Sequence, residues 1–396
     1  MAEKILIDEI GALAVVPAGP LHGGAMREYD VLRDAAVLLE GGVIRWFGAA
    51  KDAPRADARV ESVDGRLVTP GLIDAHTHIP FAGDRAAEFA RRVAGESYLS
   101  IMESGGGIRV TTSAVRAESV ESLVSLNAPR LARMIRHGVT TVECKSGYGL
   151  TRDDERKQLR ATQSLQKLTP LELVPTYMGV HAVPKEFDGR ADEFVDEMTD
   201  PVFLAEIRRE GLAEFFDVFC DRGAFSVDQA RRALSRAREA GFELKMHADE
   251  LAQIGASALA GEMQAISADH LELIDDAGVA ALKAAGTIAM VLPGTSFFLG
   301  IEHCNARRLI EAGLAVGLAT DYNPGSAHIE SLPYVMNIAC CQLRMTPKEV
   351  LAACTSNAAA ALCREKQSGA IAAGYQADLA VWNVESLDEW FYKPGR

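Results

Sequence analysis

The sequence predicts an α/β fold in which a (β/α)8 TIM barrel carries a small β-sandwich-like domain built from both ends of the chain. The chain has 396 residues, which fits one barrel of ~250 residues plus a smaller unit. Hydrophobic residues make up 48% and charged residues 24%, the balance of a folded globular protein. Eight short apolar runs alternate with amphipathic stretches between two β-rich ends.

The two ends of the chain are expected to pair in the small domain. Segments 37–39 and 43–47 flank the turn Glu40-Gly41-Gly42 and predict a hairpin. Segment 377–382 near the C-terminus has the same strand-like character. We therefore assign residues 1–67 and 363–396 to the small β domain, and residues 68–362 to the barrel.

Within the barrel segment, short apolar runs alternate with charged amphipathic stretches. Segments 226–240 and 275–285 are two such stretches, and both are predicted to be helices. Strands that alternate with helices favour a parallel sheet closed into a barrel. The eight apolar runs end at Ala75-His76, Val142-Glu143, Val180-His181, Val218-Phe219, Met246-His247, Ala268-Asp269, Val291-Leu292 and Ala319-Thr320.

The charge balance disfavours two classes of partner. The chain has 41 lysines and arginines against 55 aspartates and glutamates, which gives a net charge of −14. Such a surface repels phosphate backbones and anionic lipid heads, so neither a nucleic acid nor a membrane is an expected partner. A small acidic substrate is still compatible, because a few local cations can override the overall field.

The chain is expected to act in the cytoplasm. It begins Met1-Ala2-Glu3-Lys4, and charges at Asp8 and Glu9 interrupt the apolar stretch that a signal peptide needs. The seven cysteines are odd in number and include no Cys-x-x-Cys pair. They predict reduced thiols rather than a disulfide framework or a zinc ribbon. The sequence leaves open whether the chain forms a homodimer.

Histidines at the predicted strand ends point to a metal centre. His76 and His78 lie two residues apart, so on a strand they face the same side. Alone, such a pair is more often two unrelated loop histidines. However, His247, His270 and Asp321 end other strands, and a barrel brings all these ends to one mouth. We predict that one metal ion is bound by His76, His78, His247 and Asp321. The ion is zinc or iron, because both accept nitrogen and oxygen ligands.

Two further strand-end segments are candidates for the site. Tyr148 stands between two glycines at the predicted mouth, where the alternative is a simple turn. The turn that follows Asp321 contains Asn323, Gly325 and Ser326, which could form an anion-accepting nest or only a tight turn. Lys145, just past the second strand, is expected to make a structural salt bridge.

Several segments together resemble a known family. The first of them is similar to the opening of the metal-dependent amidohydrolase superfamily, and the set resembles the imidazolonepropionases within it. The segments are Pro70-Gly71-Leu72-Ile73-Asp74-Ala75-His76-Thr77-His78, Phe81-Ala82-Gly83-Asp84-Arg85 with Glu88-Phe89, Lys145-Ser146-Gly147-Tyr148-Gly149-Leu150, His247-Ala248-Asp249-Glu250 and Asp321-Tyr322-Asn323-Pro324-Gly325-Ser326. Ala75 departs from the proline frequent in this family. The chain also ends earlier than the family pattern, so a last strand of the small domain is expected to be absent.

The resemblance implies hydrolysis of the ring of 4-imidazolone-5-propanoate to N-formimidoyl-L-glutamate, a step of histidine degradation. It also implies roles: Asp321 would orient and deprotonate water, Glu250 would shuttle a proton, and His270 would stabilise an oxyanion. An arginine suits a substrate that bears a carboxylate, because the guanidinium binds it through two parallel hydrogen bonds. The residues implied to contact substrate or product are Arg85, Tyr148, His181, Glu250, Asn323, Gly325 and Ser326.

Three alternatives stay open on the sequence. One is another mononuclear amidohydrolase, such as a deaminase of a purine-type ring, which uses the same metal chemistry. A binuclear cyclic amidase is disfavoured, because its carboxylated lysine would stand where this chain has Phe219-Cys220-Asp221. An inactive barrel with an assembly role is disfavoured by the retention of all the candidate ligands and Glu250.

Overall fold

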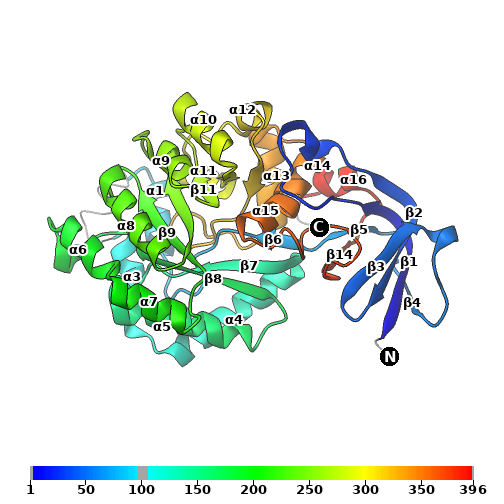
Figure 1. The fold of residues 1–396 in the computed structure, drawn as a ribbon, viewed down its shortest axis with the longest axis horizontal. Helices are drawn as coiled ribbons and strands as arrows, with labels where there is room; N and C mark the ends of the chain where they lie inside the picture. The colour runs from blue at the N-terminus through cyan, green and yellow to red at the C-terminus, as the bar shows by residue number, and fades with distance from the viewer. Residues whose placement is uncertain (1–2, 97–105, 395–396) are drawn as a thin grey trace.

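The fold is that of a computed structural model, which describes residues 3–96 and 106–394. A barrel surrounded by helices occupies one end of the molecule, and a separate sheet lies at the other (Figure 1). This arrangement confirms the predicted fold class. It also confirms that segments from both ends of the chain build the small sheet.

The barrel sheet contains eight strands whose neighbours pair in parallel and in chain order, from β6 to β13. An isolated parallel bridge between Thr77 and Tyr322 links the segments that follow the first and last strands. The sheet therefore closes at the rim, and all eight strand ends meet at one mouth. The strands are β6 (Leu72–Asp74), β7 (Val139–Lys145), β8 (Glu172–Val180), β9 (Phe215–Cys220), β10 (Glu243–Ala248), β11 (Ser267–His270), β12 (Ile288–Val291) and β13 (Val316–Leu318).

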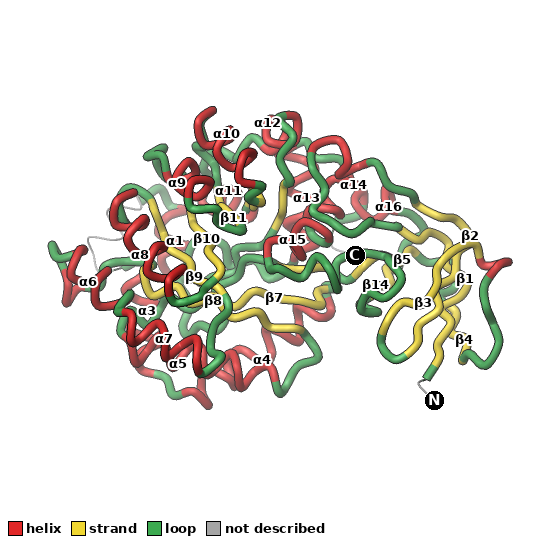
Figure 2. The backbone as a smooth tube through the Cα atoms, in the orientation of Figure 1, coloured by secondary structure: helices red, strands yellow, loops and turns green. Residues whose placement is uncertain are grey.

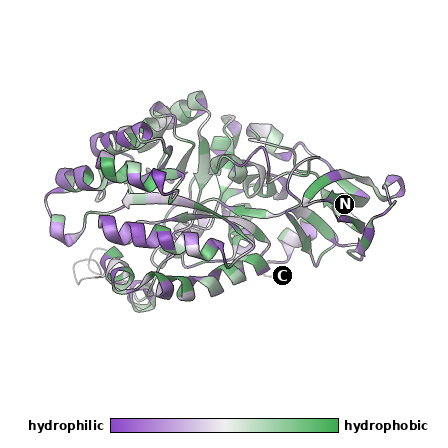
Figure 3. Ribbon diagram, turned by 60° about the horizontal axis from the view of Figure 1, so that its bottom comes forward, coloured by the Kyte–Doolittle hydropathy of each residue, from purple (hydrophilic) through white to green (hydrophobic). Residues whose placement is uncertain are grey.

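Helices surround the barrel and turn hydrophilic residues outward (Figures 2 and 3). The predicted helices at 226–240 and 275–285 are confirmed as α8 and α10, which begin after the N-caps Ser226 and Asp275. The helices are α1 (Ala86–Val93), α3 (Ile108–Ala117), α4 (Val120–Arg136), α5 (Arg152–Gln166), α6 (Ala191–Met198), α7 (Pro201–Arg209), α8 (Val227–Glu239), α9 (Ala256–Glu262), α10 (Asp276–Ala285), α11 (Pro293–Leu299), α12 (Ala306–Glu311), α13 (Leu332–Leu343), α14 (Pro347–Ala353), α15 (Ser356–Ala361) and α16 (Leu387–Tyr392). Short 3-10 helices span Gly23–Arg27, Ala50–Asp52 and Lys185–Phe187.

The small domain is one six-stranded sheet in the order β14-β5-β1-β2-β3, with β4 paired to β1. The predicted hairpin is confirmed by antiparallel pairing of β2 with β3, and the C-terminal strand β14 pairs with β5. The strands are β1 (Lys4–Ala14), β2 (Val31–Glu40), β3 (Val43–Ala49), β4 (Arg59–Ser62), β5 (Leu67–Pro70) and β14 (Leu379–Trp382).

The chain passes from the small sheet into the barrel at Gly71, between β5 and β6. The Gly71 N–H donates to the carbonyl oxygen of Asp378 at 2.7 Å. A Cβ at this position would stand 2.3 Å from Cγ2 of Thr140, so the two sheets meet too closely here for a side chain. The contact ties the first barrel strand, and the histidines that follow it, to the small domain.

Two further features of the described chain concern its helices and its cysteines. None of its helices combines the length and apolar character that crossing a membrane requires. All seven cysteines are free thiols, as predicted.

Candidate active site at the barrel mouth

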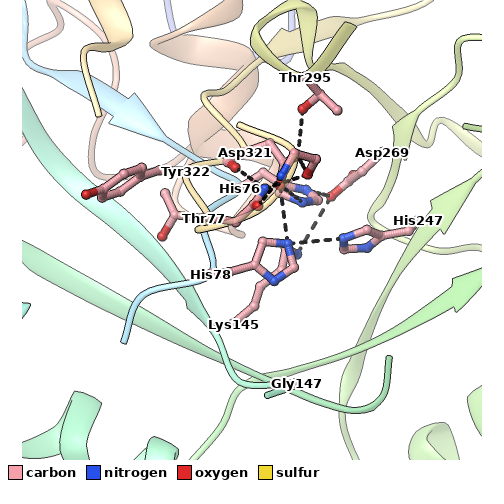
Figure 4. A network of polar contacts seen from close by, with 12 residues as sticks. His76, Thr77, His78, Lys145, Gly147, His247, Asp269, Thr295, Asp321 and Tyr322 are labelled. Carbon is pink, nitrogen blue, oxygen red and sulfur yellow. Dashed lines mark hydrogen bonds and ion pairs between the residues drawn. The ribbon is translucent and has the colours of Figure 1, made fainter. Parts of the chain in front are cut away.

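Five buried side chains from the ends of four barrel strands converge at the mouth, and Figure 4 labels four of them, His76, His78, His247 and Asp321. His76 and His78 follow β6, His247 lies in β10, His270 ends β11, and Asp321 follows β13. Each is at most 3% exposed. The predicted convergence of these strand ends is therefore present in the fold.

The four predicted ligands fall into two groups that share His76: ligand atoms of His76, His78 and His247 lie within 4.8 Å of one another, and so do those of His76, His270 and Asp321. Oδ1 of Asp321 is 3.5 Å from Nε2 of His76 and 3.3 Å from Nε2 of His78. Nε2 of His247 lies 3.4 Å from Nε2 of His78. Two of these buried atoms, Nε2 of His76 and Oδ1 of Asp321, have no hydrogen-bond partner. Buried polar atoms without partners are rare, and three imidazoles with a carboxylate are a donor set that zinc and iron accept.

Aspartates behind two of the histidines set which ring nitrogen faces the centre. Asp269 accepts a hydrogen bond from Nδ1 of His76 at 2.6 Å, and Asp217 accepts one from Nδ1 of His247 at 3.1 Å. Because Nδ1 carries the proton in both rings, Nε2 is left with a free lone pair. Such carboxylate–histidine pairs are typical of metal sites.

Burial and neighbouring groups favour the metal-binding protonation states of three predicted ligands, whereas in His76 burial is outweighed by Asp269 and Asp321, which raise its pKa. Burial lowers the pKa of His78 to about 4 and also lowers that of His247. Burial alone would raise the pKa of Asp321, but the adjacent imidazoles of His76 and His78 hold it well below its usual value. At neutral pH, His78 and His247 are neutral and Asp321 is a carboxylate, which are the metal-binding forms.

A second group of titratable residues stands on the β10–β11 side of the mouth. Nε2 of His270 is 3.6 Å from Oε2 of Glu250, and its Nδ1 is 3.8 Å from Oε2 of Glu272. Burial raises the pKa of Glu250 well above its usual value and that of Glu272 to about 8. The backbone N–H of Glu250 donates to Asp221 at 2.7 Å, which fixes the loop after β10.

Arg85 approaches the mouth from the start of α1 and packs against the turn after Asp321. A Cβ on Gly325 would stand 0.9 Å from Nη2 of Arg85. The turn is held by Oδ1 of Asn323, which accepts hydrogen bonds from the N–H groups of Gly325 at 2.7 Å and Ser326 at 2.8 Å. Those N–H groups are therefore bonded within the turn, which is the tight-turn arrangement, and anion binding by these residues stays a prediction.

Tyr148 and His181 line the mouth beside His78. The ring centroid of His78 is 5.7 Å from that of Tyr148 and 5.2 Å from that of His181. The segment around Tyr148 is fixed by Glu155, whose carboxylate accepts the N–H groups of Gly147, Gly149 and Leu150. Every site residue predicted from the sequence thus lies at this mouth or in the turn that borders it.

Sequence reasoning missed three buried acids of the site, Asp217, Asp269 and Glu272. Their signal was an acid in or next to an otherwise apolar strand, as in Phe216-Asp217-Val218. Lys145 makes the expected salt bridge, but it ends β7 rather than following it.

Comparison with known proteins places the chain in a family. The model of the amidohydrolase family matches residues 67–394. An imidazolonepropionase from Shouchella clausii is 43% identical over 401 residues, covering 99% of this chain and 90% of that protein. One from Bacillus velezensis is 44% identical over 382 residues, covering 96% of this chain and 90% of that protein. The chain belongs to the imidazolonepropionase family of amidohydrolases.

Solved structures with lower identity share the fold of this imidazolonepropionase family member. An adenosine deaminase from Xanthomonas campestris with bound zinc has a TM-score of 0.72 at 20% identity, covering 99% of this chain and 89% of that one. A 5-methylcytosine deaminase from Klebsiella pneumoniae has a TM-score of 0.73 at 17% identity, covering 98% and 93%. At these identities the likeness concerns the fold alone.

Proposed function

We propose that the chain hydrolyses the ring C–N bond of 4-imidazolone-5-propanoate to give N-formimidoyl-L-glutamate, a step of histidine catabolism. The observation that carries the proposal is the convergence of His76, His78, His247 and Asp321 at a mouth bordered by Arg85. Imidazolonepropionases at 43–44% identity over nearly the whole chain support the choice of substrate.

The proposed cofactor is one zinc or iron ion per chain, held by His76, His78, His247 and Asp321. Nε2 of His76 and Oδ1 of Asp321, which have no hydrogen-bond partner, support this assignment. When bound, such an ion polarises the ring carbonyl and lowers the pKa of a coordinated water.

The proton transfers fall to two carboxyl groups. Asp321 is held as a carboxylate and would accept the proton of the attacking water. Glu250 holds a proton because burial raises its pKa, and would give that proton to the ring nitrogen as the C–N bond breaks. The oxygen of water ends in the new carboxylate. His270, 3.6 Å from Glu250, would stabilise the negative charge that develops on the carbonyl oxygen.

Arg85 would bind the propionate of the substrate. Its guanidinium is largely buried, with 12% of the side chain exposed, and its Nε has no hydrogen-bond partner. A buried, unpartnered N–H donor of this kind suits a carboxylate. Tyr148, His181, Asn323, Gly325 and Ser326 would complete the binding surface around the ring and the new carboxylate. A cytoplasmic location is part of the proposal, supported by the free thiols.

The test of the proposal follows the absorbance of freshly made 4-imidazolone-5-propanoate in the presence of the metal-loaded protein. Guanine and dihydroorotate serve as comparison substrates for the deaminase and cyclic amidase alternatives. We expect loss of the imidazolone absorbance, with N-formimidoyl-L-glutamate identified by mass spectrometry, and no turnover of the other two compounds. Turnover of guanine without turnover of the imidazolone would overturn the proposal in favour of a deaminase.

A further inference from the structure

Five fully buried charged residues form an ionic layer inside the barrel, directly behind the histidines. Two are lysines and three are carboxylates, and all are 0% exposed. They come from four neighbouring or alternate strands of the barrel sheet: Glu143 and Lys145 from β7, Asp217 from β9, Lys245 from β10 and Asp269 from β11.

Lys145 contacts both carboxylates that hold metal-facing histidines. Its Nζ lies 2.7 Å from Oδ2 of Asp217 and 3.7 Å from Oδ2 of Asp269 (Figure 4 draws the second contact). Asp217 accepts the Nδ1 proton of His247, and Asp269 accepts that of His76. The ammonium group of Lys145 therefore contacts both carboxylates that accept a proton from a metal-facing histidine. The two histidines come from opposite sides of the centre.

Lys245 has the same burial and charge but different partners. Its Nζ donates to Oε2 of Glu143 at 2.7 Å and to the carbonyl oxygen of Ala75 at 3.0 Å. Among the described residues, no ion pair within 4.0 Å joins Lys245 to Asp217 or Asp269. Glu143 is shared, since its other oxygen accepts from Lys145 at 2.8 Å. Within the part of the chain that the structure describes, the two lysines thus differ in two respects: Lys145 alone forms ion pairs with the aspartates behind the histidines, and Lys245 alone holds the carbonyl oxygen of Ala75.

A carboxylate that holds a histidine can itself rotate, and a fixed cation restricts that rotation. The lysine ammonium has three donors and no acceptor, so it can hold several carboxylates at once. Partners outside the coordination sphere affect metal affinity because they fix the direction of the ligand lone pairs. We propose that Lys145 is a positioning residue that orients His76 and His247 through Asp269 and Asp217, and thereby sets the affinity of the centre for its metal. This inference rests on the metal centre of the proposed function.

The matched test uses two double variants, Glu143→Gln with Lys145→Met and Glu143→Gln with Lys245→Met. Each removes one buried charge of each sign, so the net charge of the layer is unchanged. The affinity for Zn²⁺ is measured by competition with a chromophoric chelator, and circular dichroism checks the fold. We expect Zn²⁺ affinity to fall by about 10- to 100-fold in the Lys145 double variant, and by clearly less in the Lys245 double variant.

Equal affinities in the two double variants would overturn the role given to Lys145, because a purely structural ionic layer makes the lysines equivalent. If a methionine variant does not fold, Lys145→Gln and Lys245→Gln keep a donor in place and make the same comparison. A parent chain that binds neither zinc nor iron would instead overturn the metal centre of the proposed function. The two failures are therefore distinguishable.

Discussion

The guanidinium of Arg85 lies against the backbone of Gly325, where a Cβ would stand 0.9 Å from Nη2 and 2.0 Å from Cζ. The backbone of Gly325 is outside the left-handed region that favours glycine, so the requirement at this position is for space. Because Asn323 fixes the turn through the N–H of Gly325, the turn has little room to retreat. Arg85 therefore keeps its place at the mouth only if residue 325 has no side chain.

Gly325→Ala is predicted to act through Arg85. The new methyl group would push the guanidinium away from its place, so KM for the imidazolone should rise while kcat changes little. The loss should approach that of Arg85→Ala. Steady-state kinetics of both single variants and of the double variant are the measurement. In the double variant the two effects should not add, because the methyl group has no guanidinium left to displace. Additive effects would show that Gly325 acts independently of Arg85.

Arg85→Ala is predicted to lose one charge-assisted contact with the propionate, of order 1.5 to 3 kcal/mol. That corresponds to roughly a 10- to 150-fold rise in KM, because the carboxylate is remote from the breaking bond. Arg85→Lys should recover only part of the loss, since an ammonium lacks the planar fork. An imidazolone without the propionate should bind poorly to the parent, and its KM should change little when Arg85 is replaced. An equally large loss with this truncated ring would mean that Arg85 acts on the ring or the fold.

Glu250→Gln is predicted to keep the metal and lose turnover. Glutamine preserves the size of the side chain but cannot give a proton to the leaving nitrogen, so kcat should fall by ~10²- to 10⁴-fold. Metal content by mass spectrometry of the purified protein is measured alongside kcat. Loss of the metal on this substitution would make Glu250 a ligand or a requirement of the fold.

Glu272 is predicted to make stability depend on pH. Burial raises its pKa from 4.5 to about 8, so between these values the folded chain keeps a proton that the unfolded chain has lost. The contribution of Glu272 to the free energy of unfolding therefore falls as pH rises across this window, and levels off above pH 8. Glu272→Gln removes this contribution, so its advantage over the parent should grow from pH 5 to pH 8 in urea titrations of the metal-free proteins. Parallel curves would contradict the assigned pKa.

The strand-end residues of the site were predictable because barrel topology alone brings them together. His76 and His78 share one strand face, and His247, His270 and Asp321 each end or follow another strand. The resemblance to a family added Arg85, Glu250 and the lining residues. Lys145 was predictable as an ion-paired residue, but its partner Asp217 lies 72 residues away on another strand. No local pattern specifies such a pairing.

The hydrogen bonding of the turn after Asp321 could not be predicted from the local sequence. Its sequence is compatible with free N–H groups that bind an anion and equally with N–H groups bonded within the turn. The choice depends on the rotamer of Asn323, whose Oδ1 accepts both N–H groups. Likewise, the close packing of Arg85 on Gly325 depends on two loops that are distant in the sequence.

Metal reconstitution tests whether turnover depends on an ion held by His76, His78, His247 and Asp321. The protein is stripped with a chelator, and Zn²⁺ or Fe²⁺ is added back while turnover of 4-imidazolone-5-propanoate is followed. We expect the stripped parent to be inactive and its activity to reach a plateau at one equivalent of metal. His76→Ala, which removes one of the four converging ligands, should neither retain stoichiometric metal nor regain activity. Full turnover by the metal-free parent, or by His76→Ala with its metal retained, would show that the reaction does not depend on a metal held by these residues.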